Sequence, residues 1–155
     1  MNITNIKYFC TTNGDGFRTA VFCSGCRLHC RGCFNKAAWD FKAGKPLSLP
    51  MLNDILNSLE PDYIEGLSIL GGEPMDPNNQ QDVSQLIQSV RSRYGNTKTI
   101  WVWTGYTKDN IPETPYKEDI LNNIDTLVDG PYIDELSDIK LQYRGSSNQN
   151  IIKLK

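Results

Sequence analysis

The sequence predicts an α/β protein whose mostly parallel strands form an open, partial (β/α) barrel. Apolar segments typical of strands alternate with segments of helical periodicity along the 155 residues. Such alternation indicates right-handed crossovers between parallel strands of one sheet. A closed eightfold barrel takes about 250 residues and rarely fewer than about 200. Because this chain is shorter, we expect an open sheet in a single domain that covers residues 1–155.

Residues with strand propensity define five expected strands. They cover residues 17–22, 67–70, 98–104, 124–128 and 151–154. Four of these strands lead directly into segments rich in cysteine, glycine or polar residues, at 23–35, 71–74, 104–106 and 129–131. In parallel sheets, ligands bind outside the carboxyl ends of the strands. We therefore expect these four segments to lie together on one rim of the sheet.

Capping residues and apolar periodicity define three expected helices. The expected helices are one capped by Ser48 that runs up to Pro61, one capped by Asn78 or Asn79 that runs up to Gly95, and a weaker one at residues 116–123. Each lies between two expected strands, so each supplies a crossover connection.

Composition excludes several classes of protein. The chain is 39% hydrophobic and 22% charged, which is typical of a globular domain. No run approaches the roughly 18 apolar residues of a membrane span, and residues 1–7 lack the pattern of a secretory signal. The net charge of −2 argues against a general nucleic-acid binder. We therefore expect a cytoplasmic protein whose partners are neither nucleic acids nor membranes.

Four of the five cysteines lie between Cys23 and Cys33, in the pattern C-x2-C-x3-C-x2-C, and Cys10 stands apart. Disulfides within so short a segment would close only small loops and constrain the unfolded chain little. In a reducing compartment, clustered thiols are more often metal ligands or redox groups. The alternative, a small buried hydrophobic residue, applies best to Cys10.

Three chemistries compete for the cysteine cluster. Zinc ribbons separate their cysteine pairs by about 15–20 residues, whereas only three residues separate Cys26 from Cys30. A single C-x2-C pair suits thioredoxin-like chemistry, which leaves the second pair without a purpose. An iron–sulfur cluster suits ligands from one short loop. The spacing favours the cluster and leaves zinc and redox thiols as alternatives.

The charges around the cysteines agree with an anionic centre. Residues 1–45 hold seven lysines and arginines against two carboxylates, and no carboxylate lies between Asp15 and Asp40. Carboxylates in that window would repel a centre built from several thiolates. A solvated basic face is the alternative explanation for the lysines.

The segment Cys26-x3-Cys30-x2-Cys33 resembles the three-cysteine signature of the radical S-adenosylmethionine enzymes. The resemblance implies a domain of that type, with a [4Fe–4S] cluster on these three cysteines in a loop at residues 23–35. One iron would stay free to bind S-adenosylmethionine, whose reductive cleavage yields a 5′-deoxyadenosyl radical. Because a fourth thiolate would close that position, we expect Cys23 not to be a ligand.

Two further segments support this resemblance. The segment from Gly71 to Pro74 is similar to the family motif that holds the methionine amino group, and Glu73 offers an acceptor for that ammonium. Taken alone, the segment would read as a plain turn. Phe34 is an expected adenine contact, with a core aromatic as the alternative. The implied cosubstrate contacts are Gly32, Cys33, Phe34, Gly71, Gly72 and Glu73.

Over nearly its whole length the chain resembles the small activating enzymes of anaerobic ribonucleotide reductases, which belong to the glycyl-radical activases. The matching segments are 13–18, 25–36, 101–106, 128–130 and 144–149. The resemblance implies hydrogen abstraction from a glycine of the large reductase subunit, with electrons from a reduced flavodoxin-like protein. Arg144 would bind a carboxylate or the partner, or belong to a capped surface turn.

Two departures from this pattern concern single positions. Asp15 stands between two glycines where the family usually has proline, and a histidine common two places after the first ligand is absent. We therefore assign His29 no role. The alternative functions are activation of another glycyl-radical enzyme, such as a formate-lyase, and non-enzymatic metal binding by four cysteines.

Overall fold

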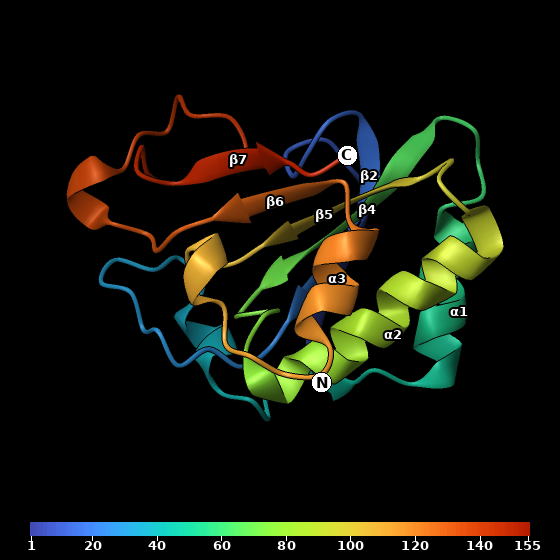
Figure 1. The fold of residues 1–155 in the computed structure, drawn as a ribbon, viewed down its shortest axis with the longest axis horizontal. Coiled ribbons are helices and arrows are strands. Elements are labelled where there is room, and N and C mark those ends of the chain that lie inside the picture. Colours follow the sequence, from blue (N-terminus) through green and yellow to red (C-terminus); the bar gives the residue numbers. More distant parts are fainter.

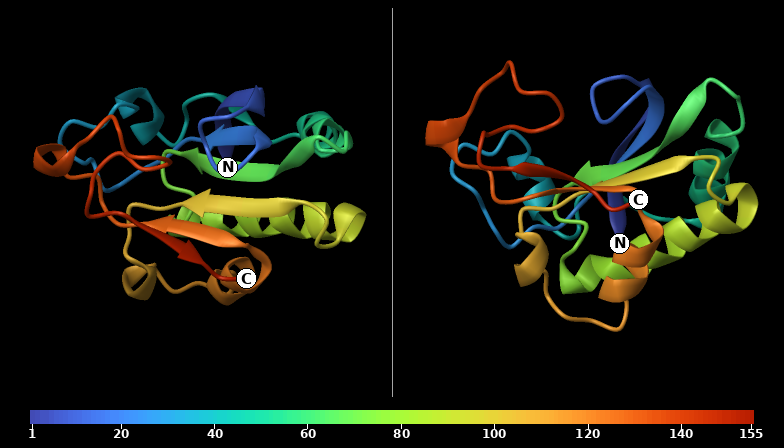
Figure 2. Two further views of the ribbon diagram at one scale, coloured as in Figure 1. Left: turned by 90° about the horizontal axis from the view of Figure 1, so that it is seen from above. Right: turned by 45° about the horizontal axis from the view of Figure 1, so that its top comes forward.

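A seven-stranded open sheet forms the centre of the molecule. The computed structural model describes residues 1–155. The strands are β1 (Asn2–Cys10), β2 (Phe17–Cys23), β3 (Lys45–Pro46), β4 (Ile64–Gly71), β5 (Thr99–Trp103), β6 (Thr126–Asp129) and β7 (Asn150–Lys153). Their order is β3-β1-β2-β4-β5-β6-β7, so β3 and β7 are the free edges. Figure 2 shows the twist of this sheet and its separated edges.

The four central strands are parallel, and the outer strands are antiparallel. β2, β4, β5 and β6 pair in parallel, whereas β1, β3 and β7 run against their neighbours. This arrangement confirms the predicted α/β class and an open sheet that is parallel in its core. The arrowheads of β4, β5 and β6 in Figure 1 point toward the side on which the blue loop after β2 lies.

Three helices cover one face of the sheet (Figure 1). They are α1 (Leu49–Ser58), α2 (Pro77–Tyr94) and α3 (Lys117–Asn123), with short 3-10 helices η1 (Lys36–Trp39), η2 (Lys108–Asn110) and η3 (Asp134–Leu136) in the connections. Ser48 caps α1 as predicted, by accepting a hydrogen bond from Met51 N. Gly95 ends α2 as predicted, with a positive φ of 58°. None of the helices combines the length and hydropathy that a bilayer crossing requires.

The predicted cap of α2 is wrong. The cap is Asp76, whose carboxylate accepts a hydrogen bond from Asn78 N, and Pro77 occupies the first turn. Asn79 lies inside the helix, where its side chain is buried and donates to the carbonyls of Ser24 and Glu73. A proline fits the first helical position because its missing N–H has no partner there in any helix. The helix therefore begins two or three residues earlier than a cap at Asn78 or Asn79 predicts.

The first strand was not predicted, because its sequence lacks a regular alternation. Its pairing with β2 shifts register between Ile3 and Asn5 and again between Lys7 and Cys10. Only Ile3 and Cys10 of this strand are buried, and Phe9 adopts a positive φ of 64°. The irregularities interrupt the period of two that marks a strand in sequence.

The hydrophobic core lies between the sheet and the helices. Alternate residues of the strands point into it, including Val21, Ile69, Val102 and Leu127. Ile55, Leu86 and Ile120 are among the helical residues that meet them. This packing fixes where each parallel strand ends, and therefore where its following loop begins.

Arg18 organises the opposite face of the sheet. Its side chain is fully buried, and burial lowers its pKa to about 10. The guanidinium donates to Ser68 Oγ at 2.8 Å, Thr99 Oγ1 at 2.8 Å and the Leu67 carbonyl at 2.9 Å. It also lies 5.6 Å from the ring centroid of Trp101. One cation therefore joins β2, β4 and β5 from the side without helices.

We expect Arg18→Ala to lower the free energy of unfolding by about 3 kcal/mol, because the acceptors on β4 and β5 lose a charged donor. Urea denaturation followed by circular dichroism measures this change. Arg31→Ala is the matched control, since that side chain is 87% exposed and a change of less than about 0.5 kcal/mol is expected. Equal stability of the two variants would contradict the structural role of Arg18.

Candidate functional site

A cavity of about 440 Å³ lies at the carboxyl ends of the parallel strands. Its walls come from the cysteine loop after β2, the loops after β4 and β5, and residues between 132 and 149. Residues 71–73 and 104–105 line it, as the predicted common rim requires. Residues 129–131 do not line it themselves, and Tyr132 reaches it instead. The topology therefore brings the chemically suggestive segments to one place.

Three of the five cysteines line this cavity. Cys26, Cys30 and Cys33 are partly exposed free thiols, and burial raises the pKa of the Cys26 thiol. Cys23 is fully buried in the hydrophobic core, where burial also raises its pKa. Cys10 is buried, and its sulfur accepts a hydrogen bond from Asn13 Nδ2. The structure thus separates three accessible thiols from two buried ones.

The donor set suits a cluster better than a single ion. No three His, Cys, Asp or Glu side chains converge closely enough to hold one metal ion. In a cubane each cysteine binds a different iron, so its thiolates stand further apart than those around one zinc ion. Cys26, Cys30 and Cys33 line one cavity, so three thiols, the ligand type that a [4Fe–4S] cluster takes, are available there.

Backbone hydrogen bonds hold the cysteine loop against η1. Gly25 N donates to the Ala38 carbonyl at 2.6 Å, and Cys26 N donates to the Trp39 carbonyl at 3.1 Å. Gly25 has a φ of +95°, and a Cβ there would come within 2.1 Å of the Phe41 ring. Only glycine adopts this φ readily and has no Cβ to clash with Phe41, so Gly25 allows the loop to turn back over η1.

An ion pair anchors the same loop to α2. Arg27 Nε lies 2.9 Å from Asp76 Oδ2, and the Asp76 side chain is fully buried. Asp76 also caps α2. A loop residue next to Cys26 is therefore tied to the start of a helix that packs on the core.

The Glu73 carboxylate connects the loops after β4 and β5. It is 1% exposed, and it accepts hydrogen bonds from Met75 N at 2.9 Å, Thr104 Oγ1 at 2.7 Å and Gly105 N at 2.6 Å. Burial raises the pKa of Glu73 to about 7, against the effect of these donors. A carboxylate has about four lone-pair sites, so capacity for one further donor, such as an ammonium, remains.

The sequence is similar to known proteins over most of its length. A family model described as a 4Fe–4S single cluster domain matches residues 12–152. Relatives named anaerobic ribonucleoside-triphosphate reductase-activating protein occur in Escherichia coli strain K12 (39% identical over 145 residues, 92% of each chain) and in Vibrio cholerae serotype O1 (40% over 141 residues, 90% of this chain and 89% of the relative). Another, from Enterobacteria phage T4, is 34% identical over 151 residues, 97% of this chain and 93% of the relative.

The chain belongs to the anaerobic ribonucleoside-triphosphate reductase-activating proteins, a family with a 4Fe–4S single cluster domain. The three cysteines of the cavity lie within the matched region. Of the three chemistries that the cysteine spacing left open, the family therefore supports the iron–sulfur cluster.

Of the other expected cosubstrate residues, Phe34, Gly71 and Gly72 line the cavity and Gly32 does not. Phe34 is 85% exposed at the cavity wall, 5.4 Å from the ring of Tyr132, so the alternative of a core aromatic is wrong. Gly71 and Gly72 line the cavity, and Gly72 N donates to the Cys23 carbonyl at 2.7 Å. Gly32 lies outside the cavity lining, with Asp134 packed closely against it.

Residues 144–149 form a hydrogen-bonded turn beside the cavity. Gln149 Oε1 accepts from Gly145 N at 2.8 Å, and Gln149 Nε2 donates to the Gly130 carbonyl at 3.0 Å. Arg144 donates through Nη1 to the Gln149 carbonyl at 2.6 Å. The turn is therefore fastened to the end of β6. Arg144 lines the cavity and forms no ion pair within the chain, so its predicted carboxylate or partner contact stays a prediction.

Trp39 is a cavity residue that the sequence did not indicate. It ends η1, lines the cavity and stacks on His29, with ring centroids 4.1 Å apart and planes 6° from parallel. No spacing rule singles out one tryptophan in a loop, because a lone aromatic more often belongs to a core. Its stacking also gives His29, which had no predicted role, a packing contact.

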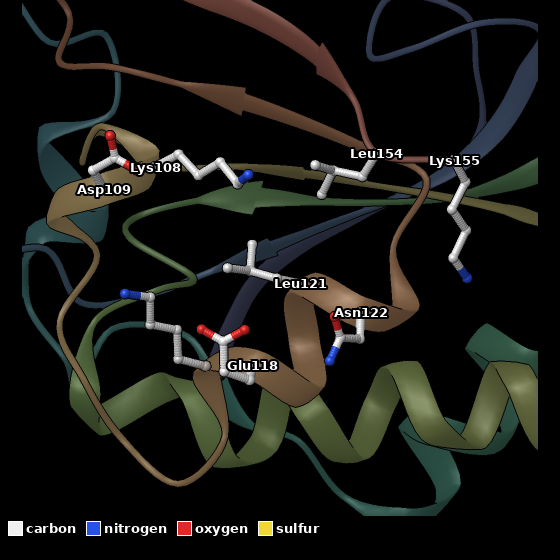
Figure 3. A pocket seen from close by; sticks show the side chains of 8 residues that line it. Lys108, Asp109, Glu118, Leu121, Asn122, Leu154 and Lys155 are labelled. Atoms are coloured by element: carbon white, nitrogen blue, oxygen red, sulfur yellow. The ribbon is translucent and has the colours of Figure 1, made fainter.

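A second cavity, of about 460 Å³, lies away from the cysteines. Figure 3 shows Lys108 and Asp109 from η2, Glu118 and Leu121 from α3, and the end of the chain around it. It contains no thiol and mixes charges of both signs. The cavity with the three cysteines is therefore the candidate functional site.

We expect the free energy of unfolding of the cluster-free protein to fall, relative to that of the Glu73→Gln variant, as the pH rises from about 4.5 to about 7. The folded pKa of Glu73 is raised, so protonated Glu73 stabilises the folded state at low pH and this contribution disappears as the group ionises. A difference of the order of 2–3 kcal/mol is expected across this range. Urea denaturation at about pH 5 and about pH 8 measures it.

Glu135→Gln is the control for this experiment, because that side chain is 69% exposed. The free energy of unfolding of Glu135→Gln should change with pH as that of the unchanged protein does. If Glu73→Gln showed the same pH dependence, the raised pKa of Glu73 would be refuted.

Proposed function

We propose that this chain is a radical S-adenosylmethionine enzyme that activates anaerobic ribonucleotide reductase. It would act as a single domain of the partial-barrel type, with its cluster loop at residues 23–35. One observation carries the proposal: Cys26, Cys30 and Cys33 line one cavity together with the loop at 71–73, whereas Cys23 is buried in the core. Three available thiolates leave one iron of a [4Fe–4S] cluster without a protein ligand.

Cys26, Cys30 and Cys33 would hold the cluster. When bound, it would supply the electron that cleaves S-adenosylmethionine to methionine and a 5′-deoxyadenosyl radical, which takes a hydrogen atom from a glycine of the large reductase subunit. The protein contributes by placing the reacting groups and excluding water. The cavity wall is well suited to this, since Leu70 and Trp103 present apolar surface beside the thiols.

The loop after β4 would bind the methionine part of S-adenosylmethionine. Glu73 would accept a hydrogen bond from the ammonium, and its position is held by Thr104 and Gly105. Gly71 and Gly72 allow close approach of a ligand to the backbone. In the cluster loop, Gly32, Cys33 and Phe34 would contact the adenine; Cys33 and Phe34 line the cavity, and Gly32 lies beside them in the chain.

The large catalytic subunit of anaerobic ribonucleotide reductase is the proposed partner. The relatives are named for activating that enzyme, and the match covers most of both chains. The target glycine would enter from the face of the sheet that carries no helix. We further propose a reduced flavodoxin-like electron donor and a cytoplasmic location, because thiolates and the cluster need a reducing compartment.

We expect Cys26→Ala, Cys30→Ala and Cys33→Ala each to abolish cluster binding and formation of 5′-deoxyadenosine. Cys23→Ala should keep both and lower the free energy of unfolding by about 1 kcal/mol, since it removes a buried sulfur from the core. Cys10→Ala is the control for a second buried thiol. Anaerobic reconstitution, iron analysis and chromatography of the reduced reaction mixture measure these outcomes.

Equal loss in all four variants of the loop would instead support a four-cysteine metal-binding module. The partner is tested separately, by adding the large reductase subunit or a formate-lyase and recording the glycyl radical by electron paramagnetic resonance. A radical on the formate-lyase alone would refute the proposed target.

A further inference from the structure

The indole N–H of Trp39 is a buried donor without an acceptor. Among buried side-chain nitrogen and oxygen atoms, only Trp39 Nε1 and Asn148 Oδ1 lack a hydrogen-bond partner. Buried polar groups are nearly always hydrogen-bonded, because leaving one unpaired costs its full desolvation free energy. The Trp39 N–H therefore needs a hydrogen-bond acceptor that the polypeptide does not supply.

Trp39 lies against the proposed ligand loop on two sides. Its carbonyl accepts the hydrogen bond from Cys26 N at 3.1 Å. Its ring stacks on His29, the residue before Cys30, with centroids 4.1 Å apart. Trp39 lines the same cavity as the three thiols. These contacts hold the indole in one orientation beside the cluster site.

The second tryptophan of the cavity already has a hydrogen-bond acceptor for its indole N–H. Trp103 Nε1 donates to the Tyr143 carbonyl at 2.7 Å. Trp39 is thus the tryptophan of this cavity whose N–H has no partner within the chain. Sulfur atoms of an iron–sulfur cluster accept hydrogen bonds, and such bonds help to set its reduction potential.

We propose that the Trp39 indole N–H donates a hydrogen bond to a sulfur of the cluster and makes the cluster easier to reduce. On reduction the cluster gains one electron, no bond breaks, and the negative charge on its sulfurs increases. A donor at this position therefore stabilises the reduced form more than the oxidised form. The inference rests on the part of the proposed function that places a [4Fe–4S] cluster on Cys26, Cys30 and Cys33.

The test is Trp39→Phe, which keeps an aromatic ring for stacking on His29 and removes the N–H. We expect the midpoint potential of the cluster to become more negative by about 59 mV, which is a tenfold change in the ratio of oxidised to reduced cluster for one electron. Potentiometric titration with a chemical reductant, followed by electron paramagnetic resonance, measures it. Trp101→Phe, the same change outside the cavity, should leave the potential unchanged.

A second measurement detects the hydrogen bond directly in the unchanged protein. In unchanged protein grown with tryptophan labelled with ¹⁵N in the indole ring, pulsed electron paramagnetic resonance of the reduced cluster should show a weakly coupled ¹⁵N. Labelled Trp39→Phe should lack this coupling. If the unchanged protein shows none, the proposal is overturned even where the variant fails to bind a cluster.

Two other results would overturn the proposal. One is an unchanged potential in Trp39→Phe at full iron content. The other is weaker binding of S-adenosylmethionine to Trp39→Phe, measured by calorimetry, with no shift of the cluster potential. That result would mean that the Trp39 N–H binds the cosubstrate and not the cluster. Failure of the proposed function is a separate result, since unchanged protein that yields no 5′-deoxyadenosine would refute that function while the measured potentials still test Trp39.

Discussion

The pairing of the end of β2 with the end of β4 is the interaction on which the site depends. Cys23 lies opposite Gly71 in the parallel ladder, and the contact continues beyond the strands. Gly72 N donates to the Cys23 carbonyl at 2.7 Å, and Glu73 N donates to the Gly25 carbonyl at 2.7 Å. These bonds place the two loops side by side. A shift of either strand by one residue would move the thiols away from the loop that carries Glu73 and would exchange core and surface side chains.

Burial divides the cysteines near the end of β2 into two groups. Cys23 is the last residue of β2, and its side chain points to the face that the helices cover, as Val21 does two residues earlier. The chain then leaves the sheet at Ser24, so Cys26, Cys30 and Cys33 escape the core and reach the cavity. The end of β2 thus separates one buried thiol from three accessible ones within eleven residues.

Two buried charged side chains, Arg18 on the helix-free face of the sheet and Glu73 at the cavity, form no salt bridge. Arg18 is buried without a salt bridge, and hydroxyl and carbonyl oxygens of β4 and β5 accept its hydrogen bonds. Glu73 is buried without a cation and is satisfied by N–H and O–H donors. A buried charge is costly, so each position is maintained by several hydrogen bonds at once. At the cavity, the bonds to Glu73 hold the loops after β4 and β5 in fixed positions, which the proposed chemistry requires.

From the sequence alone come the local features: the alternation of strands and helices, the cap of α1, the end of α2 and the spacing of Cys26, Cys30 and Cys33. Each is a pattern of neighbouring residues. The tertiary structure decided the irregular pairing of β1, the burial of Cys23, the three donors on Glu73 and the placement of Trp39 beside the thiols. These features depend on contacts between segments far apart in the chain. Such contacts leave no period or spacing in the sequence, so only the folded chain shows which donors find acceptors and which thiols stay accessible.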